Sequence, residues 1–311
     1  MVGRARSVVA LAVAVTVVGS SGPALAAAAS ASASSSAPGA DLTDDHARFP
    51  LTDAEVREAL GTAQDDVTFS VRDRRTGATY TYNPDLRTST ASIVKVLVLA
   101  TVIRERRESG RDLSERQQEL AELMIRFSDN DATTSLFEQV GRDGVARMAR
   151  DLGMTRTEID WSWGMSSTSA ADQRLLMDRL VDGTPHLSES DRRYILDLMG
   201  DVDSEQAWGV GDVPATAKAS VKNGWLPLET RGWHVNSIGS VEAPGREYTL
   251  AVLTYDNDTM ESGVERTEAV STLVWDALGT GAAAQGGPGA AAPDLPRWIT
   301  RGDAYPPRPW G

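Results

Sequence analysis

The chain has 311 residues, enough for one large domain or two smaller ones, and 41% of them are hydrophobic, so a sizeable core can form. A formal net charge of -13 argues against a nucleic-acid partner, because phosphate binding requires clustered Lys and Arg. The sequence contains no cysteine, which excludes disulfides and cysteine-based zinc or redox chemistry.

The first residues have the pattern of an export signal. Arg4 and Arg6 form a positive region, Val8 to Val18 is an apolar run, and Ala24-Leu25-Ala26 is a small-x-small cleavage site. The run is short for a membrane span, although an uncleaved anchor is the alternative. A lipid anchor is not expected without a cysteine to acylate. We therefore expect a signal peptide at 1–26 and a protein that is secreted, extracellular or cell-wall associated.

Low-complexity segments border one folded domain. Residues 27–42 are rich in Ala and Ser and are expected to form a flexible linker. Residues 280–311 are rich in Gly, Ala and Pro, a composition that predicts a disordered tail. The domain between them is expected to span 43–279.

The domain begins with a helix after Thr52, where Glu55 completes a capping box. Residues 67–72 alternate like a strand, and 79–82 return as its hairpin partner. Residues 92–107 form a helix that is apolar on nearly every side and is therefore buried. The later patterns are helices at 114–126, 131–139, 142–152 and 169–182, strands at 217–224, 233–241 and 247–255, and a last helix from 261 to 278.

This order of elements predicts an α+β fold. Strands from both ends of the domain can form one antiparallel β-sheet flanked by helices. The helical block between them then becomes an inserted all-helical lobe.

Ser92-Ile93-Val94-Lys95 places a hydroxyl and an amine on one face of the buried helix. A serine becomes a good nucleophile when a base takes its proton, and burial can depress a lysine pKa enough for that task. The helix start also supplies N–H groups for a developing oxyanion. The alternative is a serine at a helix N-terminus with a snorkelling lysine.

Ser128-Asp129-Asn130 lies between two predicted helices. As a functional motif, Ser128 relays a proton between the lysine and the leaving group, Asn130 binds a substrate amide, and Asp129 holds the turn. The alternative is a helix cap, which all three residue types favour.

Lys222-Asn223-Gly224 follows a strand pattern. Here Lys222 would bind a substrate carboxylate, Gly224 would let substrate backbone lie against the strand, and the N–H of Trp225 would complete an oxyanion hole with that of Ser92. The alternative is an Asn-Gly hairpin turn.

The three motifs in this order resemble the penicillin-recognising serine enzymes, and most closely the class A β-lactamase family. The resemblance covers about residues 45–279, and it implies a β-lactamase/transpeptidase-like fold with the active site between the two lobes. It further implies that Ser92 attacks a β-lactam or D-Ala-D-Ala-like carbonyl to give an acyl-enzyme, while Lys95 and Ser128 move protons.

The resemblance also assigns substrate binding. Asn130, Lys222, Asn223, Gly224 and Trp225 line the site, and Arg231, nine residues after Lys222 and expected on the next strand, helps to bind the carboxylate. No metal or cofactor is implied. The expected partner is a small molecule, with no nucleic acid and no membrane span after signal removal, and the protein is expected to be a monomer.

Two departures from the family pattern matter. Asn223 replaces the usual Thr or Ser, and no Glu-x-x-Leu-Asn sequence supplies the carboxylate that activates the deacylating water. Glu158 and Asp160 are the nearby carboxylates, and neither fits the pattern. We therefore expect slow deacylation. In the same shortened loop, Trp161 and Trp163 either pack the loop or line the substrate cleft.

Other classes remain as alternatives. One is a D-Ala-D-Ala peptidase or esterase on the same scaffold, and another is a catalytically weak β-lactam- or cell-wall-binding protein. A Ser-His-Asp hydrolase is disfavoured, because the mature domain has no Gly-x-Ser-x-Gly sequence and only His46, His186 and His234 are available.

Overall fold

The computed structural model describes residues 49–283, without the side chains of 280–283. The predicted signal peptide and linker, and the chain after 283, lie outside the described residues. Helix α7 (Met260–Ala283) continues past the domain boundary predicted at 279. In the part of the chain that the structure describes, no helix combines the length and hydrophobicity needed to cross a bilayer.

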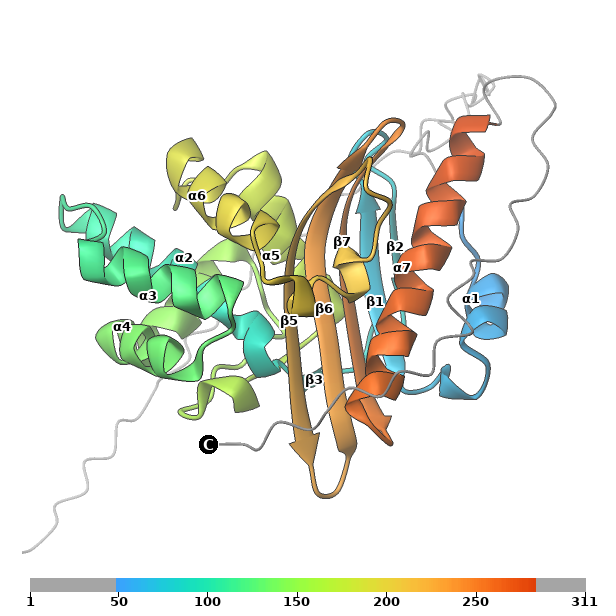
Figure 1. Ribbon diagram of the computed structural model, residues 1–311, viewed down its shortest axis with the longest axis horizontal. Helices are drawn as coiled ribbons and strands as arrows, with labels where there is room; N and C mark the ends of the chain where they lie inside the picture. Colours follow the sequence, from blue (N-terminus) through green and yellow to red (C-terminus); the bar gives the residue numbers. More distant parts are fainter. Residues whose placement is uncertain (1–48, 284–311) are drawn as a thin grey trace, which may run out of the picture. The chain divides into compact units, whose positions relative to one another are not determined.

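Five antiparallel strands form one sheet in the order β2-β1-β7-β6-β5 (Figure 1). The strands are β1 (Val67–Asp73), β2 (Thr79–Tyr82), β5 (Lys218–Leu228), β6 (Gly232–Ala243) and β7 (Arg246–Asn257). As predicted, strands from both ends of the domain pair directly, with Phe69 opposite Val252. Strand β5 lies at an edge, so its outer side is available to the helical lobe.

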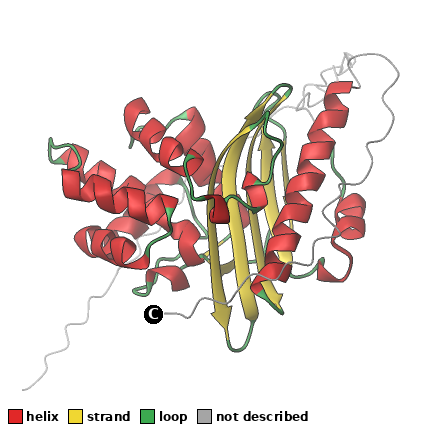
Figure 2. Cartoon of the chain, viewed as in Figure 1, coloured by secondary structure: helices red, strands yellow, loops and turns green. Residues whose placement is uncertain are grey.

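Helices cover both faces of this sheet (Figures 1 and 2). The remaining helices are α1 (Asp53–Leu60), α2 (Val94–Glu108), α3 (Glu115–Arg126), α4 (Asn130–Leu152), α5 (Ala170–Asp182) and α6 (Glu189–Gly200). α7 packs on one face with α1 beside it, and α5 packs on the opposite face together with the α2–α4 and α6 lobe. The predicted α+β architecture with an inserted helical lobe is confirmed.

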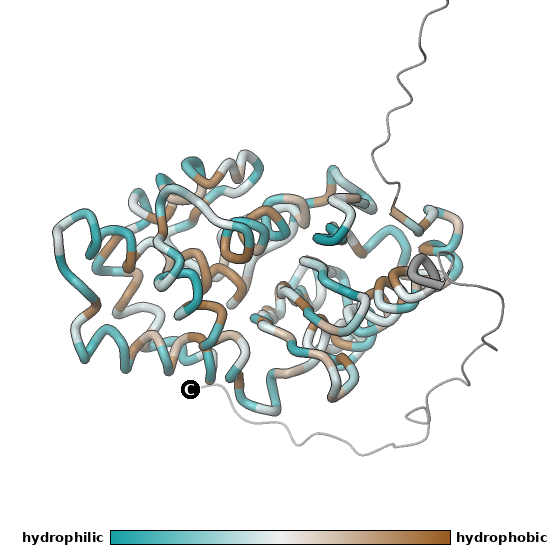
Figure 3. Tube along the Cα trace, turned by 90° about the horizontal axis from the view of Figure 1, so that it is seen from above, coloured by the Kyte–Doolittle hydropathy of each residue, from teal (hydrophilic) through white to brown (hydrophobic). Residues whose placement is uncertain are grey.

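Two hydrophobic clusters form the core, one on each side of the sheet. Val67, Phe69 and Val71 alternate along β1 into the cluster beneath α7. α2 is buried from Val94 through Ile103, because its apolar residues occupy every side of the helix. In the hydropathy-coloured trace, hydrophilic residues predominate on the outer turns (Figure 3).

Several elements differ from the sequence prediction. α6 was not predicted, because its fully buried apolar residues are Ile195 and Met199, and its other apolar side chains are only partly buried. The two helices expected at 131–139 and 142–152 are confirmed: they carry the one label α4, but Gly141 between them is non-helical (φ 65°, ψ 164°). A short second sheet pairs β3 (Thr88–Ser89) with β4 (Ser167–Thr168).

Candidate active site

Ser92 lies in a 3-10 turn, Ala91–Ile93, that leads directly into α2. The turn begins with Ala91 at φ 46°, a left-handed conformation that costs a residue with a Cβ about 1–3 kcal/mol. Such strain persists only where the surrounding structure enforces it. The geometry therefore holds the candidate nucleophile at a sharp entry to the central helix.

The Lys95 side chain is fully buried and aimed at the Ser128-Asp129-Asn130 segment. Its Nζ donates hydrogen bonds to Ser128 O at 2.6 Å, Ser128 Oγ at 3.1 Å and Asn130 Oδ1 at 2.9 Å. Burial lowers the pKa of Lys95 to about 7, with a smaller opposing effect from the Asp129 charge. An amine with this pKa can accept a proton at neutral pH.

The segment between α3 and α4 serves as a helix cap and as part of the site. Asp129 is the N-cap of α4, and its carboxylate accepts from Ala132 N at 2.7 Å. This cap fixes the chain so that Ser128, at φ 56°, and Asn130 both reach Lys95. Asp129 therefore caps the helix, while Ser128 and Asn130 contact Lys95, so the cap alternative and the functional interpretation are compatible.

Lys222 reaches the same hydroxyl from the sheet. Its Nζ donates to Ser128 Oγ at 2.9 Å and to Asn223 O at 2.9 Å. Because Lys95 Nζ is 3.1 Å from that oxygen, the two amines lie within about 6 Å of each other. Complete burial and the positive charge of Lys95 hold the pKa of Lys222 well below its usual range.

The lysine usage of the chain singles out these two positions. The sequence has three lysines, Lys95, Lys218 and Lys222, although Lys and Arg together number 31. Lys218 is exposed on the same strand as Lys222. Two of the three lysines therefore lie in the candidate site. Arginine could not replace them as a titratable amine, because a guanidinium stays charged in proteins.

Gly224 allows β5 to approach Ser92, the candidate nucleophile. A Cβ at this position would lie 2.5 Å from Ser92 N and 2.9 Å from Ile93 N. Any side chain would push the strand away from the turn. From the sequence, Gly224 was expected to let substrate backbone lie against the strand. In the structure, the absence of a side chain at Gly224 lets the backbone of Ser92 and Ile93 lie against this strand.

Two predicted substrate-binding residues, Asn223 and Trp225, make side-chain contacts that the sequence did not predict. Asn223 donates its amide to Gln206 O at 2.8 Å and Trp208 O at 3.0 Å, so this side chain holds the loop after α6. Trp225 lies on β5 with its ring 6.1 Å from the Trp208 ring. Since 222–224 are in the middle of a strand that continues to Leu228, the hairpin-turn alternative is wrong.

The predicted position of Arg231 on the next strand is wrong. Arg231 lies in the turn between Leu228 and Gly232, at the end of the β5–β6 hairpin. Its guanidinium is 5.0 Å from the Tyr255 ring centroid, and its carbonyl accepts from Asp256 N. The hairpin is longer than expected, and its extra length moves Arg231 away from Gly224.

Two residues of β6 that sequence reasoning did not assign to the site fix the segment before the nucleophile. Asn236 donates to Ser89 O at 2.8 Å and Thr90 O at 3.2 Å, and His234 Nδ1 accepts from Ser89 N at 3.2 Å. Burial lowers the pKa of His234 to about 4, so the ring is a neutral acceptor at pH 7. His234 therefore has a structural contact beside the site.

Trp163 covers the other side of Lys95. It lies in the turn η3 (Trp163–Met165), where its ring centroid is 4.9 Å from Lys95 Nζ and its Nε1 donates to Thr134 Oγ1 at 3.3 Å. Of the two interpretations given for this tryptophan, lining the site is the one that the contacts favour.

The carboxylates of the same loop serve structural roles. Glu158 pairs with Arg87 at 3.1 Å, and Asp160 accepts from the backbone of Ser162 at 2.8 Å. Among the described residues, no carboxylate hydrogen-bonds Lys95. On the side of Lys95 that faces this loop, the amine lies against the indole ring of Trp163.

Comparisons with known proteins show the family of the chain. A family model described as "Beta-lactamase enzyme family" matches residues 52–118 and 116–278. The curated proteins "Putative lipoprotein LppW" of Mycobacterium tuberculosis and Mycobacterium bovis are each 26% identical over 216 residues, which cover 66% of this chain and 68% of theirs.

Solved structures show the same fold. A β-lactamase from Sphaerobacter thermophilus has a TM-score of 0.65 at 20% identity, covering 74% of this chain and 99% of that one. A class A β-lactamase from Mycobacterium abscessus has a TM-score of 0.63 at 19% identity, with coverages of 74% and 100%.

Proposed function

Because the chain belongs to the β-lactamase enzyme family, we propose that it is a serine hydrolase of the class A β-lactamase type that forms an acyl-enzyme on Ser92. The observation that carries the proposal is the hydroxyl of Ser128, which hydrogen-bonds the buried amines of both Lys95 and Lys222. This arrangement connects a candidate base on the nucleophile helix with a candidate carboxylate site on the sheet.

In the proposed reaction, Ser92 Oγ attacks the carbonyl carbon of a β-lactam or a D-Ala-D-Ala-like amide. Lys95, neutral in part at pH 7, takes the hydroxyl proton as the oxygen–carbon bond forms. Ser128 then passes a proton to the leaving nitrogen as the carbon–nitrogen bond breaks, and it is replenished from the neighbouring amines. The product is an ester on Ser92.

Substrate binding would use groups from both lobes. Lys222 supplies positive charge for a carboxylate, and Asn130 can donate its amide to a substrate carbonyl while its Oδ1 accepts from Lys95. The N–H groups of Ser92 and Trp225 are proposed to bind the oxyanion, since Gly224 brings their backbones close together. Arg231 and the Asn223 side chain are left out of the proposed site, because their contacts lie elsewhere.

Release of the acyl group is proposed to be slow. Hydrolysis of the ester requires a water and a base near Lys95, and Trp163 occupies that side of the amine. An indole neither accepts a proton nor orients a water as a carboxylate does. The same observation favours a second candidate, a protein that traps β-lactam-like ligands with little turnover.

Export to the cell envelope or beyond is also proposed. The N-terminal pattern of charged, apolar and small residues supports export, and the relatives named as lipoproteins support an envelope location. A monomeric state, which light scattering would measure, is proposed as well.

Mixing the protein with benzylpenicillin and following its intact mass tests the function. We expect a covalent adduct on the peptide that contains Ser92, and none on the Ser92→Ala variant. Rapid turnover of a D-Ala-D-Ala peptide with no penicillin adduct would instead favour the peptidase alternative. Binding of penicillin that Ser92→Ala leaves unchanged, without any adduct in the parent protein, would favour a noncovalent binding protein.

A further inference from the structure

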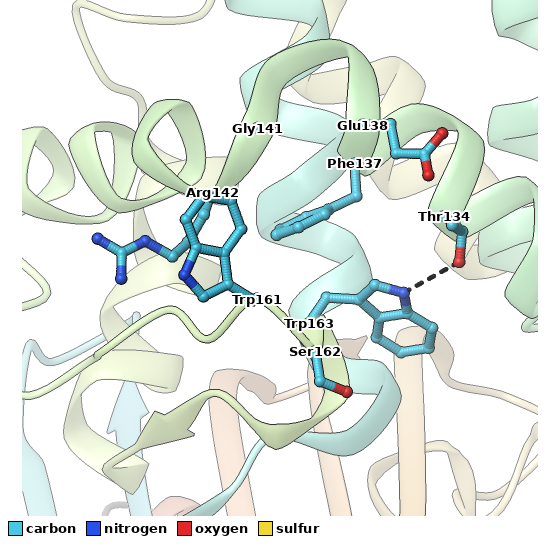
Figure 4. Close-up of a pocket in the computed structure, with 8 residues that line it drawn as sticks. All are labelled: Thr134, Phe137, Glu138, Gly141, Arg142, Trp161, Ser162 and Trp163. Atoms are coloured by element: carbon cyan, nitrogen blue, oxygen red, sulfur yellow. Dashed lines mark hydrogen bonds between the residues drawn. The ribbon is translucent and has the colours of Figure 1, made fainter.

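A cavity of about 520 Å³ lies beside the candidate active site, between α4 and the loop that contains η3. This volume is within the range of about 300–1,000 Å³ typical of small-molecule sites. Figure 4 shows three aromatic rings around it, from Phe137 on α4 and from Trp161 and Trp163 on the loop. The proposed acyl transfer does not use this cavity.

Trp161 is the unusual wall of the cavity. It is 74% exposed, the highest value among the exposed large hydrophobic residues in the described part of the chain. Its ring does not pack in the core, and its described contact is with the Arg142 guanidinium, 5.1 Å away. A tryptophan held on the surface at the mouth of a cavity offers a flat apolar face and an N–H donor to a ligand.

Polar groups of opposite charge stand at the two ends of the aromatic walls. Arg142 lies at one end, and Glu138 and Thr134 lie at the other (Figure 4). The lining has one cationic and one anionic side chain, and Arg142 is already paired with Asp143 through Nε and Nη2 at 3.1 and 3.0 Å, so the cavity offers no unpaired cation to an anion. The chemistry suits a neutral ligand with apolar faces and hydrogen-bonding edges.

The cavity adjoins the candidate acylation site through Trp163 and helix α4. Trp163 lines the cavity and also covers Lys95 at 4.9 Å. On α4, Asn130, Thr134 and Glu138 follow at intervals of four residues, so they share one helix face that leads from the site into the cavity. A ligand in the cavity would therefore lie next to the group that acylates Ser92.

We propose that this cavity is a sugar subsite, which binds one or two neutral pyranose rings against Trp161 and Trp163. A pyranose presents C–H faces that pack on indole rings, and its hydroxyl edges can hydrogen-bond Glu138 at one end and Arg142 at the other. The inference goes beyond acyl transfer; where it extends to the reaction it rests on the proposed function, and it then implies an acyl donor that carries a sugar.

The test uses the Ser92→Ala protein, so that sugar binding is measured whether or not the enzyme acylates. Chitotriose and cellotriose are titrated while the indole N–H signals are followed by NMR. Binding of either sugar with shifts at Trp161 and Trp163 is expected. Trp161→Ala should weaken binding by about tenfold, because it removes one stacking face.

Met165→Ala is the matched control, because Met165 is an exposed apolar residue of the same loop that lies outside the cavity. It should leave sugar binding unchanged. The proposal is overturned if neither sugar shifts the two indole signals, whether or not phenylacetate shifts them. It is also overturned if Trp161→Ala and Met165→Ala have equal effects on sugar binding.

Discussion

Removing the charge of Lys222 should raise the pH at which Ser92 becomes reactive. Lys95 can act as a base only when its amine is neutral, so reactivity should rise with pH through its pKa of about 7. A neighbouring like charge disfavours protonation and lowers a pKa. Lys222→Met removes such a charge and keeps a side chain of similar length in the buried position.

The size of the effect follows from the geometry. Both amines hydrogen-bond Ser128 Oγ and so lie within about 6 Å of each other. Two unit charges at about 6 Å interact by about 3 kcal/mol at an effective dielectric constant of about 20, which equals about 2 pKa units. Because burial lowers the pKa of Lys222, its positive charge is diminished at neutral pH, and about 2 units is the upper bound of the upward shift expected for the pKa of Lys95.

The assay uses a fluorophosphonate, which forms a bond to Ser92 Oγ and expels fluoride. This probe carries no carboxylate, so loss of the proposed carboxylate site does not affect its binding. Labelling rates are measured by intact mass between about pH 5 and pH 10. At pH 7 the Lys222→Met rate should fall, by up to about 50-fold for a shift of about 2 units, and near pH 10 it should approach that of the parent.

Lys218→Met is the matched control, because it removes the exposed lysine of the same strand. It should leave the pH profile unchanged. With lysine side chains labelled with ¹³C, the three lysine signals also report the pKa values directly. A labelling rate that is flat with pH in the parent, or an inflection that Lys222→Met does not move, would refute the reasoning.

Three further outcomes are expected. Gly224→Ala should slow acylation about 100-fold, because the added Cβ would lie 2.5 Å from Ser92 N. Gly200→Ala is the control and should be tolerated, because its Cβ would have its nearest contact at 3.7 Å. Equal acylation rates for the two variants would contradict the close approach of β5 to Ser92. Trp163→Glu should shorten the lifetime of the acyl adduct about 100-fold by supplying a carboxylate beside Lys95, whereas Trp163→Leu should not. An unchanged lifetime for Trp163→Glu in pulse-chase mass measurements would argue against the indole as the cause of slow deacylation. Burial raises the folded-state pKa of Glu268 to about 7, so the fold loses stability as pH rises from about 4.5 through 7 and this buried carboxyl must ionise. Glu268→Gln should therefore stabilise the fold by about 1–2 kcal/mol at pH 8 and by little at pH 4. Equal effects at both pH values in denaturant unfolding would count against this.

Local sequence patterns predicted the nucleophile helix and its lysine. Val94 to Ile103 are apolar on all sides, so burial of the helix and of Lys95 within it followed from periodicity alone. Ser128 and Asn130 could be placed near Lys95 only by resemblance, since helix capping explains the same residues. The capping geometry of Asp129 is what makes both functions compatible.

Other features depended on contacts that the sequence does not encode locally. The predicted strand ends at 224, but β5 is an edge strand, where the missing N–H of Pro227 is tolerated, and it continues to Leu228. The nine-residue spacing to Arg231 therefore ended in the hairpin turn. Trp163 meets Lys95 across a long separation in the chain, and no periodic pattern signals such a contact.

The central claim is that the chain keeps the acylation machinery and lacks the group that releases the product. Rapid-quench mixing with benzylpenicillin, followed by intact mass and by product analysis of the same samples, measures both steps. The account predicts that the Ser92 adduct approaches one per chain before appreciable free penicilloate forms. Free product that accumulates at a constant rate, while the adduct never exceeds a minor fraction of the protein, would contradict it.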